Sequence, residues 1–188
     1  MGLRASPKFF SAVSVASCFE FRSNSLTKDP PMLPSRNQLL SHLRRANEVA
    51  LRVKSLGRHP FGCLLVAPDG VTVLAEQGNI DTVRHAESTL AQIASLNYSR
   101  EFLWECTLVT TFEPCAMCTG TIYWANIGHI VYGASERELL ALTGNAEENP
   151  TLDLPCRDLI AKGQKKIRVT GPFPELTEEL IEPHRGFW

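Results

Sequence analysis

The chain has 188 residues, of which 44% are hydrophobic and 21% are charged. This length and composition are typical of one globular domain with a substantial core. Nineteen basic and twenty acidic side chains give a formal net charge of −1. The chain therefore lacks the broad positive field that attracts a polyanion, and nucleic acid is a disfavoured partner.

The first 35 residues differ in composition from the rest. They are rich in serine, carry four basic residues against two acidic ones, and end in a proline-rich break. We expect residues 1–35 to be a flexible extension of a cytoplasmic protein whose folded domain spans residues 36–188. Three targeting interpretations stay open: an organellar transit peptide, a secretory signal in FFSAVSVASC, and myristoylation of Gly2. The apolar run is short and broken by serines, which favours none of the three. We expect no membrane span.

The folded pattern begins with an amphipathic helix and a hairpin. Apolar residues recur at helical spacing from residue 37 until Gly57 ends the pattern. Two β-type runs then follow, over residues 61–67 and 71–77, on either side of the turn triplet Pro68–Gly70. A turn between two such runs predicts an antiparallel hairpin.

Helices and strands alternate in the next part of the chain. The patterns predict a helix over residues 85–96, a buried strand over 106–111, a helix over 115–127 and a strand over 129–134. A strand, helix and strand in that order predict a right-handed parallel crossover.

Two further elements complete the predicted fold. Residues 165–171 alternate as a strand does, and residues 174–183 form a last short helix. Together these elements predict an α/β protein, a three-layer α/β/α sandwich with a mixed sheet of about five strands.

Titratable residues gather where the second and third predicted helices begin. His85 and Glu87 are two residues apart, so they do not share a helix side and can serve one site only beyond the helix N-terminus. Cys115 and Cys118 lie three apart on one face, at the start of the next helix. They are the only two of the six cysteines with metal-ligand spacing, and the other four fit buried thiols of a reducing compartment.

These residues predict a zinc site with catalytic chemistry. A helix N-terminus favours the thiolate that binds Zn²⁺, and His85 completes a set of one nitrogen and two sulfur ligands. Three protein ligands leave one position open for water, which zinc acidifies. Glu87 can then take the proton and pass it to a leaving amine, which is hydrolytic deamination. A structural or redox site is the alternative for these ligands.

Segments 85–87 (HAE) and 114–118 (PCAMC) together resemble the signature of the cytidine deaminase-like superfamily. The resemblance covers roughly residues 37–188. It is closest to the small nucleobase and nucleoside deaminases, including the guanine and fungal cytosine enzymes, and less close to tRNA adenosine deaminases. It implies one Zn²⁺ per chain, a small nucleobase or nucleoside as substrate, and Glu87 as the catalytic residue; we also expect a homodimer.

Several further residues are candidates for the substrate pocket, each with a structural alternative. By analogy with the family, Asn79 binds the base or sugar, although it also suits a strand end. Backbone amides near Ala86 and Cys115 would stabilise the negative charge that develops during the reaction. In the family, the backbone approaches the substrate at the position of Pro114. Two aromatic candidates are Phe61 and Trp124, which also suit a hydrophobic core. The other two are Phe187 and Trp188. They form either a lid over the active site or a packing contact with their own domain or with a second subunit of a dimer.

Two other functions stay open. A tRNA adenosine deaminase needs a basic groove at the pocket mouth, and the one basic cluster, Lys162 to Arg168, also suits a solvated turn. A non-catalytic zinc-binding assembly domain has no use for Glu87.

Overall fold

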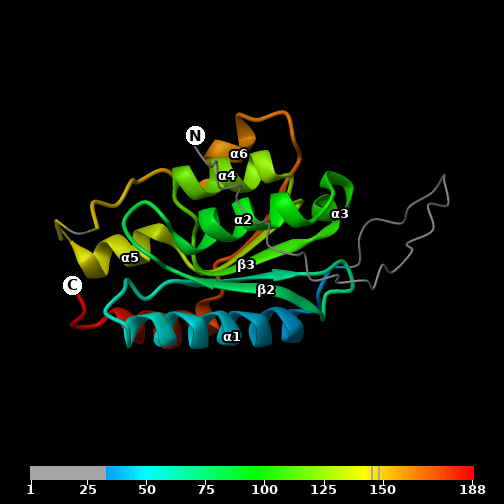
Figure 1. Ribbon diagram of the computed structural model, residues 1–188. Coiled ribbons are helices and arrows are strands. Elements are labelled where there is room, and N and C mark those ends of the chain that lie inside the picture. The colour runs from blue at the N-terminus through cyan, green and yellow to red at the C-terminus, as the bar shows by residue number, and fades with distance from the viewer. Residues whose placement is uncertain (1–32, 145, 148) are drawn as a thin grey trace, which may run out of the picture.

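The computed structural model describes residues 33–144, 146–147 and 149–188 (Figure 1). The three targeting interpretations fall on residues 1–32 and so lie outside the described residues. Pro34, which we assigned to the extension, is buried and lies against Gly70 in the turn of the hairpin. The packed part of the chain therefore includes the two residues before the first helix.

A five-stranded mixed sheet forms the centre of the domain. Its strands are β1 (Gly62–Val66), β2 (Val73–Gly78), β3 (Thr107–Phe112), β4 (His129–Ala134) and β5 (Arg168–Thr170). They lie in the order β2-β1-β3-β4-β5. Strand β1 is antiparallel to β2 and β3, whereas β3, β4 and β5 are parallel. The predicted hairpin, parallel crossover and mixed sheet are confirmed.

Helices cover both faces of the sheet, as Figure 1 shows. Helix α1 lies with α7 on one face, and α2, α3, α4 and α6 lie on the other. The helices are α1 (Arg36–Lys54), α2 (Ala86–Asn97), α3 (Arg100–Glu105), α4 (Ala116–Ala125), α5 (Glu136–Thr143), α6 (Cys156–Ala161) and α7 (Thr177–Ile181), with 3₁₀ turns at Pro174–Leu176 and Glu182–His184. The architecture is the predicted α/β/α sandwich.

Alternation along the central strands divides the core into two clusters. In β1, Leu64 and Val66 face α1, whereas Cys63 and Leu65 face α2 and α4. All four side chains are fully buried, so β1 is apolar on both faces, as a strand inside a three-layer sandwich must be.

Helix α1 approaches β1 very closely. A Cβ built on Gly62 would lie 2.3 Å from the carbonyl oxygen of Ala46 and 2.7 Å from the amide nitrogen of Ala50. Only glycine allows this approach, because the obstructing atoms belong to the helix backbone and cannot move aside.

Three short helices and some boundaries were not predicted. The structure adds α3, α5 and α6, and β5 is shorter than the predicted 165–171. Helix α5 begins with a capping box in which Ser135 and Glu138 bond each other's backbone amides, a signal that the sequence carries but that we did not use. Among the described residues, no helix has the length and apolar character needed to cross a membrane.

Candidate active site

The predicted site residues meet where α2 and α4 begin. His85 is the N-cap residue of α2 and Cys115 that of α4, and both have extended backbone conformations. Glu87 and Cys118 lie in the first turns of these helices. The two helices pack side by side on the same face of the sheet. Their N-termini therefore bring together residues that are 30 positions apart in sequence.

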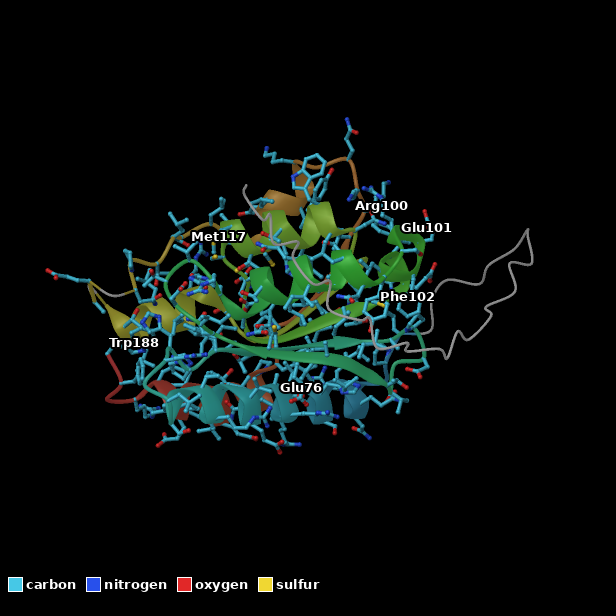
Figure 2. All side chains as sticks on the ribbon, in the orientation of Figure 1. Glu76, Arg100, Glu101, Phe102, Met117 and Trp188 are labelled. Atoms are coloured by element: carbon cyan, nitrogen blue, oxygen red, sulfur yellow. The ribbon has the colours of Figure 1, made fainter. Side chains whose placement is uncertain are left out.

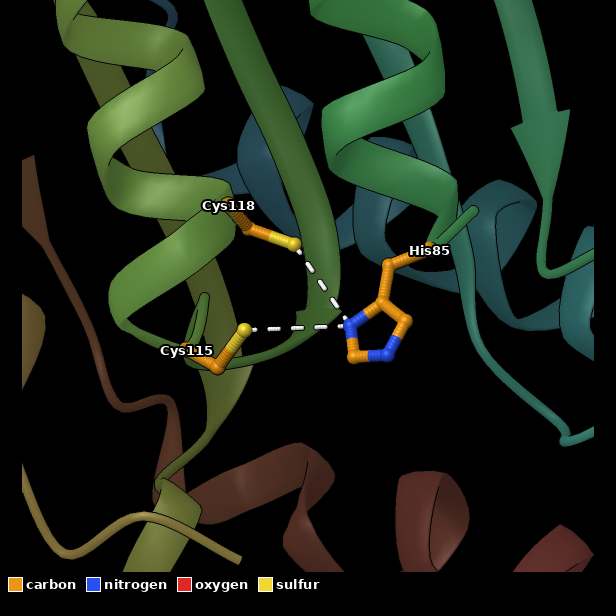
Figure 3. Close-up of side chains that lie close together, drawn as sticks. All are labelled: His85, Cys115 and Cys118. Carbon is orange, nitrogen blue, oxygen red and sulfur yellow. Dashed lines mark hydrogen bonds between the residues drawn. The ribbon is translucent and has the colours of Figure 1, made fainter. Parts of the chain in front are cut away.

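Three ligand atoms converge on one point, as Figure 3 shows. The sulfur atoms of Cys115 and Cys118 lie 3.7 Å and 3.6 Å from Nδ1 of His85. A tetrahedral Zn²⁺, bonded to sulfur at about 2.3 Å and to nitrogen at about 2.0–2.1 Å, holds two such atoms about 3.5 Å apart. The spacing of the donor set therefore fits zinc.

A hydrogen bond fixes the orientation of the histidine. Nε2 of His85 donates to the carbonyl oxygen of Thr82 at 3.1 Å, because that oxygen can only accept. Nδ1 is therefore the nitrogen that faces the two sulfur atoms. Metal-binding histidines commonly use this arrangement to set the tautomer and the plane of the ring.

The two thiols have opposite shifts in pKa. The hydrogen bond from Cys118 lowers the pKa of Cys115 to about 4, and the bond to His85 acts in the same direction against the effect of burial. The bond to Cys115 and burial raise the pKa of Cys118. Cys115 is therefore ready as a thiolate, while Cys118 gives up its proton when a metal ion binds.

Glu87 lies beside the ligands but bonds to a strand residue. Its side chain is 5% exposed and accepts a 2.6 Å hydrogen bond from Oγ1 of Thr110 in β3. Its other oxygen lies 3.5 Å from the sulfur of Cys118. Burial raises the pKa of Glu87, although the bond from Thr110 opposes the shift. A carboxyl group buried at this position, beside the ligand cluster, is placed to take and give a proton.

A pocket opens onto this cluster, with a cavity volume of about 30 Å³. Its walls combine residues of the candidate metal cluster with rings, an aliphatic side chain and carboxyl groups. The lining residues are Phe61, His85, Glu87, Phe112, Glu113, Cys115, Glu136, Leu139 and Asn149. Two aromatic rings and a leucine beside several polar groups suit a small planar ligand that carries hydrogen-bonding groups.

Glu113 has a structural role in this wall. One carboxylate oxygen accepts from the backbone amide of Cys156 at 2.9 Å, and the other from that of Glu136 at 3.3 Å. Glu113 thus joins the start of α5 and the start of α6 to the end of β3.

Two of the candidate substrate residues, Phe61 and Asn79, lie close to the pocket. Phe61 lines it, and its carbonyl oxygen accepts from the backbone amide of Asn79. The Asn79 side chain is 1% exposed and donates to the carbonyl oxygen of Asp81. Its Oδ1 is buried and has no hydrogen-bond partner among the described residues.

Ala86 and Pro114 are both buried, and each lies next to a zinc-site residue in sequence. Ala86 is the first residue of α2, where backbone amides lack helical partners. The Pro114 carbonyl already accepts from Oγ1 of Thr119 at 2.9 Å.

The remaining aromatic candidates differ in position. Trp124 is 74% exposed and lies near Lys165, so the structure does not bring it to the described pocket. Trp188 packs on Phe61 and His184, and Phe187 packs on Trp188. The C-terminal rings therefore cover one of the pocket's lining residues from outside.

Five lining residues are not among the candidates named above from the sequence, namely Phe112, Glu113, Glu136, Leu139 and Asn149. The parallel order of β3 and β4 could have revealed two of them. Phe112 ends β3, and Glu136 follows β4 after one intervening residue. Because the carboxyl ends of parallel strands meet at one sheet edge, both positions are expected beside the site.

Comparison with known proteins agrees with this geometry. Residues 36–134 match the family described as the cytidine and deoxycytidylate deaminase zinc-binding region. A probable cytosine deaminase of Schizosaccharomyces pombe is 36% identical over 152 residues, which cover 79% of this chain and 91% of that protein. A tRNA-specific adenosine deaminase of Haemophilus influenzae is 34% identical over 99 residues, 50% of this chain and 57% of that protein.

A solved structure extends the similarity to the fold. The guanine deaminase of Nitrosomonas europaea aligns with a TM-score of 0.58 at 20% identity, covering 85% of this chain and 87% of that one. The family match spans the two helix starts that carry His85, Glu87, Cys115 and Cys118. The chain therefore belongs to the cytidine and deoxycytidylate deaminase family and is a hydrolytic deaminase.

Proposed function

We propose that the chain is a zinc-dependent deaminase that removes the exocyclic amine of a free nucleobase or nucleoside and releases ammonia. The observation that carries this proposal is the position of Glu87. Its buried carboxyl group lies beside the ligand cluster and in the wall of the same pocket. A purely structural zinc site has no use for a proton carrier at that point.

His85, Cys115 and Cys118 would hold one Zn²⁺ per chain. When bound, the ion supplies an acidified water molecule as the nucleophile. Glu87 would carry the two protons of that water in turn, the first to the ring nitrogen and the second to the amine, which then leaves as ammonia. Thr110 keeps the Glu87 carboxyl group in place through its 2.6 Å hydrogen bond.

Recognition of the substrate depends on the remaining walls. Phe61 and Phe112 offer flat apolar faces to a ring. Asn79 would offer its unpartnered Oδ1 as an acceptor, and backbone amides near Ala86 would stabilise developing negative charge.

The C-terminal rings would act as a lid. A cavity of about 30 Å³ holds on the order of one or two water molecules. A planar base therefore enters only if a wall moves, and Trp188 lies on Phe61 at the chain end. We propose that Phe187 and Trp188 move away for entry and return to exclude water.

The charge of the pocket favours a small molecule over tRNA. Three lining residues are glutamates, and His85 is the only basic residue in the described lining. Such a wall offers little positive charge to a phosphate backbone. In the one basic cluster, Lys165 is turned toward the carbonyl oxygen and ring of Tyr123.

We also propose a homodimer in the cytoplasm. Leu96 at the end of α2 and Trp124 in α4 are 86% and 74% exposed, and large exposed apolar groups often mark an interface. The five described cysteines are free thiols, which suits a reducing compartment. Analytical ultracentrifugation of the wild type and of Trp124→Glu would test the dimer, which this variant should weaken.

The central experiment is an ammonia-release assay. The zinc-loaded protein would be incubated with cytosine, guanine, adenine and their nucleosides. We expect release from at least one of them and none from the Glu87→Gln variant. No release from any of these compounds by the wild type would contradict the proposed function.

A further inference from the structure

Three glutamates line the pocket, but only two of them have hydrogen-bond partners within the part of the chain that the structure describes. Glu87 accepts from Thr110, and Glu113 accepts from the backbone amides of Cys156 and Glu136. The carboxyl group of Glu136 has no hydrogen bond or ion pair among the described residues, although it lines the same cavity.

The backbone around Glu136 is firmly held. Ser135 caps the helix that Glu136 begins, and Glu138 completes the capping box. The amide of Glu136 itself donates to Glu113. The side chain therefore projects from a fixed point, and its direction into the pocket follows from the fold.

An acidic group in a pocket wall needs a donor from elsewhere. Removing a carboxyl group from water without a compensating hydrogen bond is costly, and Glu136 is half-buried. Ionised or protonated, a carboxyl group keeps an oxygen that can accept an N–H. The substrate brings such a donor into the pocket each time it binds.

The residues that share the cavity indicate which part of the substrate lies near Glu136. Glu136 lines the same cavity of about 30 Å³ as Cys115 and Glu87. Glu136 is therefore on the catalytic side of the pocket, where the reacting carbon must lie. The exocyclic amine is the N–H donor attached to that carbon.

We propose that Glu136 accepts a hydrogen bond from the exocyclic amine of the substrate and thereby selects amine-bearing bases. This inference rests on the proposed function and names a specificity-determining residue for it. The reaction replaces the amine with a carbonyl oxygen, which offers no hydrogen to Glu136.

The test is a double-mutant-type cycle in which both the ligand and the side chain at position 136 are changed. The two ligands of a pair differ only in the amine. The pairs are cytosine with 2-hydroxypyrimidine, and guanine with hypoxanthine. Binding is measured by calorimetry on zinc-loaded protein in a Glu87→Gln background, so that the amine stays intact. The second change is Glu136→Leu, and the cycle isolates the contact between Glu136 and the amine.

We expect Glu136→Leu to weaken binding of the amine-bearing base roughly 10- to 100-fold, because the buried amine N–H is then left without an acceptor. Binding of the ring without the amine should change less than about 3-fold. Glu136→Gln keeps an acceptor oxygen and should retain most of the preference. An equal loss for both ligands, or no loss, would overturn the proposal.

Two controls separate this contact from a structural effect. Glu101, in the first turn of α3, is exposed and lies at the far end of the molecule from Trp188 (Figure 2). Glu101→Leu should leave all four affinities unchanged. Zinc content and melting temperature are compared across the variants, and Glu136→Gln supports the test if Glu136→Leu does not fold.

Failure of this inference and failure of the proposed function give different results. If the wild type releases ammonia but Glu136→Leu keeps the full preference for the amine, only the role of Glu136 is wrong. If the wild type releases no ammonia from any base or nucleoside, both proposals are wrong.

Discussion

His129 makes the stability of the fold depend on pH in a calculable way. Its ring lies at the start of β4, with Nδ1 3.2 Å from Oγ1 of Thr107 and Nε2 2.9 Å from Oγ1 of Thr170. Burial, and after it the charge of Arg168, lowers the pKa of His129 from 6.5 to about 4. At pH values between these two pKa values, His129 is protonated in the unfolded chain but neutral in the folded chain.

The sign and size of the effect follow from linkage. Because the unfolded state binds more protons in this interval, the free energy of unfolding falls as the pH falls from 6.5 toward 4. The two pKa values give a loss of about 2 kcal/mol between pH 7 and pH 5. His129→Gln removes the titrating group and keeps a polar side chain, so this part of the pH dependence should disappear.

Urea unfolding of both proteins at pH 7 and pH 5, at equal zinc content, measures the difference. Other titrating groups and zinc release affect both proteins and cancel in the comparison. An identical loss of stability in wild type and His129→Gln would refute the reasoning, since His129 would then not be buried as a neutral ring.

Three further predictions concern the metal and the two ends of the chain. His85→Ala or Cys115→Ala should lose zinc by elemental analysis and lower the melting temperature, because metal binding favours the folded state; normal zinc content would mean that the ligands are misassigned. Deletion of the last four residues should raise KM or reduce turnover well beyond its effect on stability, with zinc retained; unchanged kinetics would reject the lid. A chain that begins at Leu33 should unfold and react as the full chain does, and a large drop in melting temperature would place residues 1–32 in the core.

Local patterns in the sequence were sufficient to predict the ligand cluster. The i, i+3 spacing of Cys115 and Cys118 at a helix start requires both sulfur atoms to lie on one face. Residues two positions apart at a helix N-terminus do not share a helix face, so they can serve one site only beyond that N-terminus. His85 and Glu87 meet the cysteines at this position. Neither inference needs knowledge of distant contacts.

Residues whose role depends on tertiary packing were harder to predict. Glu136 enters the pocket only because β4 lies parallel to β3, so that two segments far apart in sequence end at the same edge. The position of Trp124 could have been anticipated. It is six residues beyond Cys118, and at about 100° per residue it points away from that side of α4. Its 74% exposure agrees with this geometry.

The most direct test of the account is a paired measurement on Glu87→Gln. We assign Glu87 to proton transfer and not to metal binding, because its carboxyl group bonds to Thr110 while the ligand atoms of His85, Cys115 and Cys118 converge on one another. The variant should retain about one zinc per chain by elemental analysis, while ammonia release falls by at least the roughly 10²- to 10⁴-fold that general acid–base catalysis contributes. Loss of zinc from the variant, or full activity with zinc retained, would contradict the assignment.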